Sequence, residues 1–284
     1  MVEIVQFFPP TESALAGLRD CLVDVVAGTE AGLHDVSARI VDGIPHPAID
    51  AERFAAAMAA WGFPRHRIDD AMALRDEYFE SIDDGGRALR SLAGRTFVAR
   101  FGQDPECAWM WHERAASLQG FCIGYDKAAL EEELEMPVWA VRYIDRPPLV
   151  DSFVFAVAVD QREWHDEVAS DPTADSEWVA TYVADRDEAH ELMGALWRDL
   201  FCVLPSDWAW QREMRLLMED DDRQDLGRRC RGRGVRQVIM GERMPREFRR
   251  GLIDTVRSYG RHVQLAEARA VSDTFRLAIE PYRT

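Results

Sequence analysis

A carboxylate, an amide and a guanidinium stand at alternate positions in residues 208–217, as Gln211, Glu213 and Arg215. The apolar residues around them predict a strand, and alternate side chains of a strand share one face. We therefore expect a polar row beside one cleft, with the two tryptophans of this segment packed behind it. A carboxylate flanked in this way can hold a sugar diol or stabilise a developing positive charge. A solvent-exposed sheet face with neighbouring charges is the alternative interpretation.

A second group of candidate residues lies in residues 105–118, where the pattern predicts a helix. Trp111 falls on the apolar stripe of this helix, and Trp109, His112 and Glu113 fall on a more polar stripe beside it. His112 could carry a proton, because imidazole titrates near neutral pH. A hydrogen-bonded structural histidine is the alternative.

A third group lies between two predicted strands, where the acidic run 219–225 is followed by the basic run 228–234. This order predicts a long hairpin loop. Its arginines, among them Arg229 and Arg231, could grip a pyrophosphate or a nucleic-acid backbone, and its glycines would let the backbone approach closely. A loop whose opposite charges neutralise each other is the alternative.

The elements that must position these groups follow an irregular order along the chain. Residues 1–94 are predicted to be mainly helical, and residues 95–284 to form an α+β core, although both could belong to one continuous domain. The absence of regular βαβ repeats favours a mixed or antiparallel sheet with flanking helices. Strands are predicted at 2–8, 96–101, 121–125, 138–144, 153–159, 208–217, 235–240, 263–266 and 274–279, and helices of the core at 105–118, 127–135, 161–168, 176–202 and 246–259.

The composition is that of a folded, acidic protein. The chain has 284 residues, of which 47% are hydrophobic and 10% aromatic, which is enough for a sizeable core. Its 34 basic and 51 acidic residues give a net charge of −17. Such a charge repels phosphate polymers and anionic lipid, so we expect neither membrane binding nor non-specific nucleic-acid binding.

The cysteines and the N-terminal residues indicate a reducing, cytoplasmic setting. The five cysteines are odd in number and scattered without a Cys-x-x-Cys pair, so the sequence predicts neither a disulfide framework nor a metal site. Residues 1–10 contain no lysine or arginine, unlike a secretory signal. No apolar run approaches the roughly 18 residues of a membrane span.

Four motifs occur in order between residues 95 and 281: Met110-Trp111, the strand Gly-Phe-Cys-Ile-Gly-Tyr-Asp, the segment Trp-x-Trp-Gln-x-Glu-x-Arg, and Val-Arg-Gln-Val-Ile-Met-Gly. Together they resemble the bacterial family known as domain of unknown function 2971, whose name implies no established reaction. Two positions depart from that family's pattern. Arg114 stands where the family usually has Tyr, and Gln211 stands where it has a first Glu.

The layout is similar, more loosely, to ADP-ribosyltransferase-like domains, which carry a Gln-x-Glu or Glu-x-Glu pair on a strand. This resemblance implies NAD as the substrate, with Glu213 holding the nicotinamide-ribose hydroxyl and supporting an oxocarbenium-like transition state. Gln211 would orient an unidentified macromolecular acceptor. A bacterial toxin or phage-defence effector is the context that such a family implies. The further residues expected to bind the substrate are Arg215, Arg100, Trp111, His112, Tyr125, Arg229 and Arg231.

Two other classes of function remain open. A non-catalytic recognition or interaction module of the same family is favoured by the departures at Arg114 and Gln211. A metal-dependent nuclease would use Glu213 with Asp207 and a divalent ion. The catalytic lysine usual at such sites is missing near this segment, because Lys127 is the only lysine of the chain.

Overall fold

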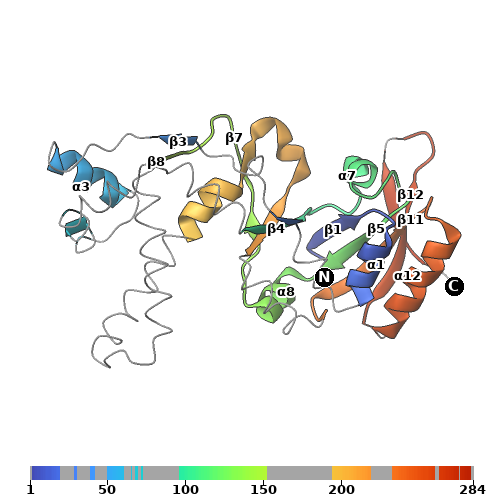
Figure 1. Cartoon of the computed structure of the whole chain (residues 1–284). Helices are drawn as coiled ribbons and strands as arrows, with labels where there is room; N and C mark the ends of the chain where they lie inside the picture. The colour runs from blue at the N-terminus through green and yellow to red at the C-terminus, as the bar shows by residue number, and fades with distance from the viewer. Residues whose placement is uncertain are drawn as a thin grey trace, which may run out of the picture. The chain divides into compact units, whose positions relative to one another are not determined.

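A computed structural model describes residues 2–19, 29–30, 39–41, 50–60, 65, 68–69, 72, 96–151, 194–218, 232–259, 262–274 and 276–282. Its class is α+β, with helices flanking a mixed sheet, as the irregular order of the elements predicts (Figure 1). The chain divides into two compact units. The first combines residues 1–31, 95–143 and 206–284, and the second combines residues 32–94 and 144–205.

The main sheet of the first unit has the strand order β1-β5-β11-β12-β13. Its pairs are antiparallel except β11 with β12, which run parallel and are connected through the helix α12. The elements are β1 (Ile4–Phe8), β5 (Phe121–Tyr125), β11 (Val235–Gly241), α12 (Arg246–Ser258), β12 (Gln264–Ala270) and β13 (Leu277–Pro281).

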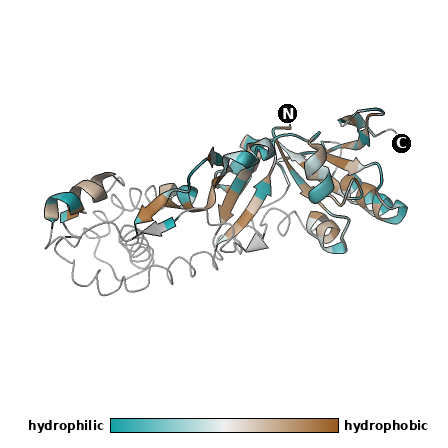
Figure 2. Ribbon diagram, turned by 90° about the horizontal axis from the view of Figure 1, so that it is seen from above, coloured by the Kyte–Doolittle hydropathy of each residue, from teal (hydrophilic) through white to brown (hydrophobic). Residues whose placement is uncertain are grey.

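The central strands of this sheet are buried on both faces. On one face Ile123 packs in a cluster with Leu252 of α12, and on the other Cys122 packs in a cluster with Trp111. Strands buried in this way read as continuous apolar runs. Figure 2 shows these apolar strands, whereas the helices beside them carry polar residues as well. The predicted strands at 121–125 and 235–240 are confirmed.

A second, antiparallel sheet of the first unit has the order β2-β4-β10-β6. Its strands are β2 (Thr29–Glu30), β4 (Phe97–Phe101), β10 (Met214–Met218) and β6 (Trp139–Ala140). The two sheets meet at a bridge in which the amide of Val5 donates to the carbonyl of Gly102 over 2.8 Å, and the Gly102 amide donates back over 2.7 Å. This junction joins β1 to β4 and forms the base of the site described below.

The prediction of one strand over residues 208–217 is wrong. Ser206–Gln211 forms a 3-10 helix, η3, and the strand β10 begins only at Met214. Between them Arg212 has a left-handed backbone, with φ of 45°. The sequence carries the reason: Ser206 and Asp207, after a proline, are helix-start residues that the alternation rule overlooks. Gln211 therefore does not share a strand face with Glu213.

Of the helices of the first unit, those predicted at 127–135 and 246–259 match these bounds to within one residue, whereas the one predicted at 105–118 is shorter than predicted. α1 (Glu12–Arg19) has Thr11 at its start, whose hydroxyl accepts from the Ala14 amide. α8 (Lys127–Leu134) starts at Asp126, whose carboxylate accepts from the Ala129 amide over 3.0 Å. α7 covers only Ala108–Glu113 of the predicted helix 105–118.

Close packing explains the early end of α7. Residues 116–118 all have positive φ, so the chain turns back in a left-handed conformation. A side chain at Gly241 would place its Cβ 2.0 Å from the Leu118 carbonyl oxygen, and one at Gly120 would lie 2.0 Å from the Phe8 carbonyl oxygen. Gly241, which lies far away in the sequence, and Gly120, two residues after the turn, thus make room for it.

The second unit is described only in part. β3 (Arg39–Val41) pairs in parallel with β8 (Leu149–Asp151), and α3 (Ala51–Ala60) buries Phe54 and Met58. β9 (Val203–Pro205) is a short strand of this unit, and the short strand β7 (Arg142–Ile144) has its first two residues in the first unit. The elements predicted at 153–159 and 161–168 and most of that at 176–202 lie outside the described residues, and the mainly helical character of 1–94 stays a prediction. In the part of the chain that the structure describes, no helix has the length and apolarity to span a bilayer.

Candidate functional site

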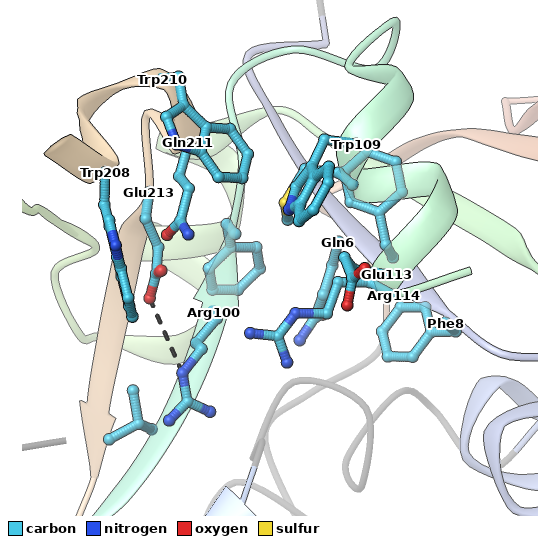
Figure 3. A pocket seen from close by; sticks show the side chains of 14 residues that line it. Gln6, Phe8, Arg100, Trp109, Glu113, Arg114, Trp208, Trp210, Gln211 and Glu213 are labelled. Carbon is cyan, nitrogen blue, oxygen red and sulfur yellow. Dashed lines mark ion pairs between the residues drawn. The ribbon is translucent and has the colours of Figure 1, made fainter. Parts of the chain in front are cut away.

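A cavity of about 570 Å³ opens in the first unit beside the junction of the two sheets (Figure 3). Strands β1 and β4 form its base, α7 one wall, and η3 with the residues after it another. It combines aromatic, cationic, carboxylate and amide side chains. The lining residues are Gln6, Phe7, Phe8, Val98, Arg100, Phe101, Trp109, Met110, Glu113, Arg114, Trp208, Trp210, Gln211 and Glu213.

Glu213 is the buried carboxylate of this cavity, with 8% of its surface exposed. Its Oε1 accepts from Nε of Arg215 over 2.7 Å and lies 3.8 Å from Nε of Arg100. These two arginines face each other across the β10–β4 pair, so two guanidiniums flank one carboxylate. None of the described residues donates a hydrogen bond to the second oxygen of Glu213, Oε2. The side chain of Glu213 is part of the cavity lining.

The backbone of Glu213 is held as firmly as its side chain. Its amide donates to the hydroxyl of Tyr143 over 2.7 Å, and its carbonyl accepts from the Val141 amide over 3.0 Å. Burial raises the pKa of the Tyr143 hydroxyl above its usual value, so this phenol stays protonated at neutral pH. The carboxylate is thus fixed before any ligand arrives, which is what electrostatic stabilisation of a reacting charge requires.

Three exposed tryptophans, Trp109, Trp208 and Trp210, rim the cavity, and we call them the tryptophan rim. Their exposed fractions are 54%, 50% and 45%. The rings of Trp109 and Trp210 meet edge to face, with centroids 5.7 Å apart and an interplanar angle of 83°. Large side chains gathered at such exposure mark a binding site more often than a free surface.

Two guanidiniums bring positive charge to the cavity. Arg100 reaches it from β4 with 22% of its side chain exposed, and Arg114 reaches it from the end of α7 (Figure 3). The amides of Gln6 and Gln211 add hydrogen-bonding groups to the same lining. The arrangement can therefore hold a ligand that combines flat rings, hydroxyls and an anionic group.

Of the residues expected from the sequence, Gln211, Glu213 and Arg100 come together at this cavity. Arg215 does not line it, since it is buried behind Glu213 with 2% of its surface exposed. The expectation that Trp208 and Trp210 pack behind the polar row is wrong, because both indoles are about half exposed.

Trp111 and Tyr125 lie beneath the cavity instead of in its lining. Trp111 is buried, donates from its indole nitrogen to the Pro105 carbonyl over 2.7 Å, and meets the ring of Phe7 edge to face. Tyr125 is buried and donates from its hydroxyl to Gln6 over 3.3 Å. Each therefore supports a residue that does line the cavity.

His112 lies outside this cavity, and the predicted anion-binding loop lies outside the described residues. Nδ1 of His112 is 2.8 Å from the Ser117 hydroxyl, beside a separate cavity of about 170 Å³. Arg229 and Arg231, with most of the run 228–234, fall in a segment that the structure does not describe.

The strand interpretation missed the tryptophan rim, although the sequence held one signal for it. Trp109 stands on the polar stripe of its helix beside His112 and Glu113, and a tryptophan on a polar face is an exposed one. The sequence marks Arg114 only as a departure from the pattern of the family that it resembles.

The described residues contain no group of three or more histidine, cysteine, aspartate or glutamate side chains that could hold a metal ion. Asp207, the proposed partner of Glu213 in a metal site, is not among the residues that line the cavity. The metal-dependent nuclease stays an untested alternative.

No model of a known protein family, no curated protein and no solved structure matches this chain. The resemblance to domain of unknown function 2971 and to ADP-ribosyltransferase-like domains therefore stays a prediction, and the site must be interpreted from its own geometry.

Proposed function

We propose that the chain is an ADP-ribosyltransferase-like enzyme that binds NAD in the cavity around Glu213. The observation that carries this proposal is a fixed carboxylate, whose Oε2 accepts no hydrogen bond from the described residues, inside a cavity lined by indoles and guanidiniums. NAD offers the matching groups, because it combines flat rings, ribose hydroxyls and a pyrophosphate.

Glu213 is the group proposed to act on the reacting sugar. Its Oε2 accepts a hydrogen bond from a hydroxyl of the nicotinamide ribose, and Arg215 holds Oε1 so that the carboxylate cannot turn away. The bond from C1′ to the nicotinamide nitrogen breaks with its electron pair, which releases neutral nicotinamide. The carboxylate stabilises the oxocarbenium-like charge that develops on the sugar.

The rest of the cavity binds and orients. Arg100 offers hydrogen bonds to the pyrophosphate oxygens, since a guanidinium matches a phosphate in charge and shape. The nucleophile, water or an acceptor group, forms a new bond to C1′ with its own electron pair and gives its proton to solvent. Gln211, beside Glu213 in the lining, is placed to orient that nucleophile.

A non-catalytic recognition module is the second candidate, and one observation favours it. Glu213 is paired with Arg215, whose side chain is only 3% exposed, and a buried pair of this kind also occurs with a purely structural role. In that case the cavity would bind a nucleotide-like ligand without turning it over.

Replacement of Glu213 separates the two candidates. Glu213→Gln keeps the size of the side chain and removes its charge, so nicotinamide release from NAD should fall about a hundredfold or more. The melting temperature should rise with NAD in both forms, because ligand at about 100-fold over Kd stabilises the native state by about 2.7 kcal/mol. Glu132→Gln, on the exposed side of α8, is the matched control and should release nicotinamide at the wild-type rate.

The outcomes are distinct. Stabilisation by NAD without release from either form would identify a recognition module. Equal release from wild type and Glu213→Gln would show that this carboxylate is not catalytic.

A further inference from the structure

The tryptophan rim presents exposed aromatic surface in addition to the carboxylate of Glu213. All three of its indoles keep about half of their surface exposed, and Trp109 and Trp210 support each other through an edge contact. Stacking of a flat ring on an exposed indole stabilises a complex without requiring a particular hydrogen-bonding pattern. The rim is therefore suited to a planar, aromatic ligand.

Arg114 lines the same cavity as these indoles, and its positive charge indicates that the ligand carries a negative charge. Its guanidinium points into the cavity (Figure 3), and within the described part of the chain it takes part in no hydrogen bond or ion pair. Arg100, by contrast, already lies beside Glu213. An exposed guanidinium next to stacking surfaces matches an anion attached to a flat ring, which is the chemistry of a nucleotide.

We propose that the tryptophan rim and Arg114 form a second subsite, which binds a nucleobase together with its phosphate. The nucleotide is either free or an unpaired nucleotide of a single strand. Its role as the acceptor of ADP-ribose rests on the proposed function, whereas its binding does not require NAD. In the transfer, an N–H nitrogen of the base bonds to C1′ with its own electron pair as nicotinamide leaves with the electron pair of the old bond, and the proton of that nitrogen passes to water.

The net charge of −17 limits how such a ligand is held. Duplex DNA or a long electrostatic track would be repelled, so the base supplies most of the affinity and Arg114 contacts a single phosphate. Each phosphate contact to a single strand contributes a slope of about −0.7 in log K against log salt. We expect a slope of about −1 or shallower, unlike that of a protein with a basic binding surface.

Binding of nucleosides, of nucleoside monophosphates and of single-stranded ten-nucleotide oligomers, measured by calorimetric titration without NAD, tests the subsite. Trp109→Ala should weaken binding about tenfold, whereas Trp109→Phe, which retains a flat ring, should stay within about threefold of wild type. Arg114→Gln should weaken binding of the monophosphate and not of the nucleoside. Arg250→Gln, an exposed arginine on α12 away from the cavity, is the control and should change neither.

The two sources of the nucleotide give different results that both support the subsite. Monophosphates that bind as tightly as oligomers indicate a free nucleotide, and oligomers that bind more tightly indicate a single strand. Absence of binding by both, or equal binding by Trp109→Ala and wild type, would overturn the proposal. So would competition between NAD and the monophosphate, because the rim would then hold the second ring of NAD itself. A lack of NAD turnover would contradict only the proposed function.

Discussion

The buried pair of Glu213 and Arg215 makes a quantitative prediction for Arg215→Met. Methionine fills a similar apolar volume but leaves Glu213, with 9% of its side chain exposed, with Arg100 at 3.8 Å as its one ion-pair partner among the described residues. Removal of one partner of a buried ion pair costs about 3–5 kcal/mol, because the remaining charge stays desolvated. Since Arg100 still offsets part of that charge, we expect a loss near the lower limit, about 3 kcal/mol.

Urea unfolding followed by tryptophan fluorescence measures this loss, and a double-mutant cycle assigns it to the pair. In the double variant Glu213→Gln/Arg215→Met no unpaired charge is left, so part of the lost stability should return. The coupling energy should be about 1.5–3 kcal/mol. A loss below about 1 kcal/mol for Arg215→Met would match a solvent-exposed pair and would refute the claim that Glu213 is held in a buried ion pair.

Two further predictions test packing and charge elsewhere in the first unit. Burial raises the pKa of Glu267, but hydrogen bonds from Arg249 and Arg269 outweigh burial and lower it below its usual value of 4.5. The free energy of unfolding of wild type should therefore exceed that of Glu267→Gln by about 2 kcal/mol at pH 7. This difference should begin to shrink as the pH falls through about 4.5 and should vanish below the lowered pKa of the folded state; a difference unchanged at pH 3 would contradict this. Gly241→Ala places a Cβ 2.0 Å from a carbonyl oxygen and should cost about 2–3 kcal/mol or more, whereas Gly194→Ala, with nothing within 4 Å, should be neutral or slightly stabilising in the same urea titration.

The main elements of the fold could be predicted because their signals are local. β5 is a continuous apolar run of strand length, and β11 holds the apolar run 238–240. The helices α8 and α12 start beside a capping aspartate and a proline. The early end of α7 could not be predicted in this way. It depends on Gly241, which lies far away in the sequence and lets the chain turn back at residues 116–118.

The sequence predicts part of the candidate site, but it assigns the residues to a strand that the structure does not contain. Gln211 and Glu213 do meet at one cavity, but through a 3-10 turn and a left-handed residue and not through a shared strand face. The alternation rule assigned Trp208 and Trp210 to a buried face, so the tryptophan rim was missed. Its formation depends on bringing α7 and η3 together, which no local pattern encodes.

A crystal structure of the Glu213→Gln variant with NAD is the most direct test of the proposed function, because that variant should bind NAD and leave it intact. We predict that a hydroxyl of the nicotinamide ribose lies within about 3 Å of the side-chain oxygen at position 213, with a pyrophosphate oxygen of NAD beside the guanidinium of Arg100. NAD bound elsewhere on the chain, or a cavity left empty at NAD concentrations that saturate binding in solution, would contradict the proposal.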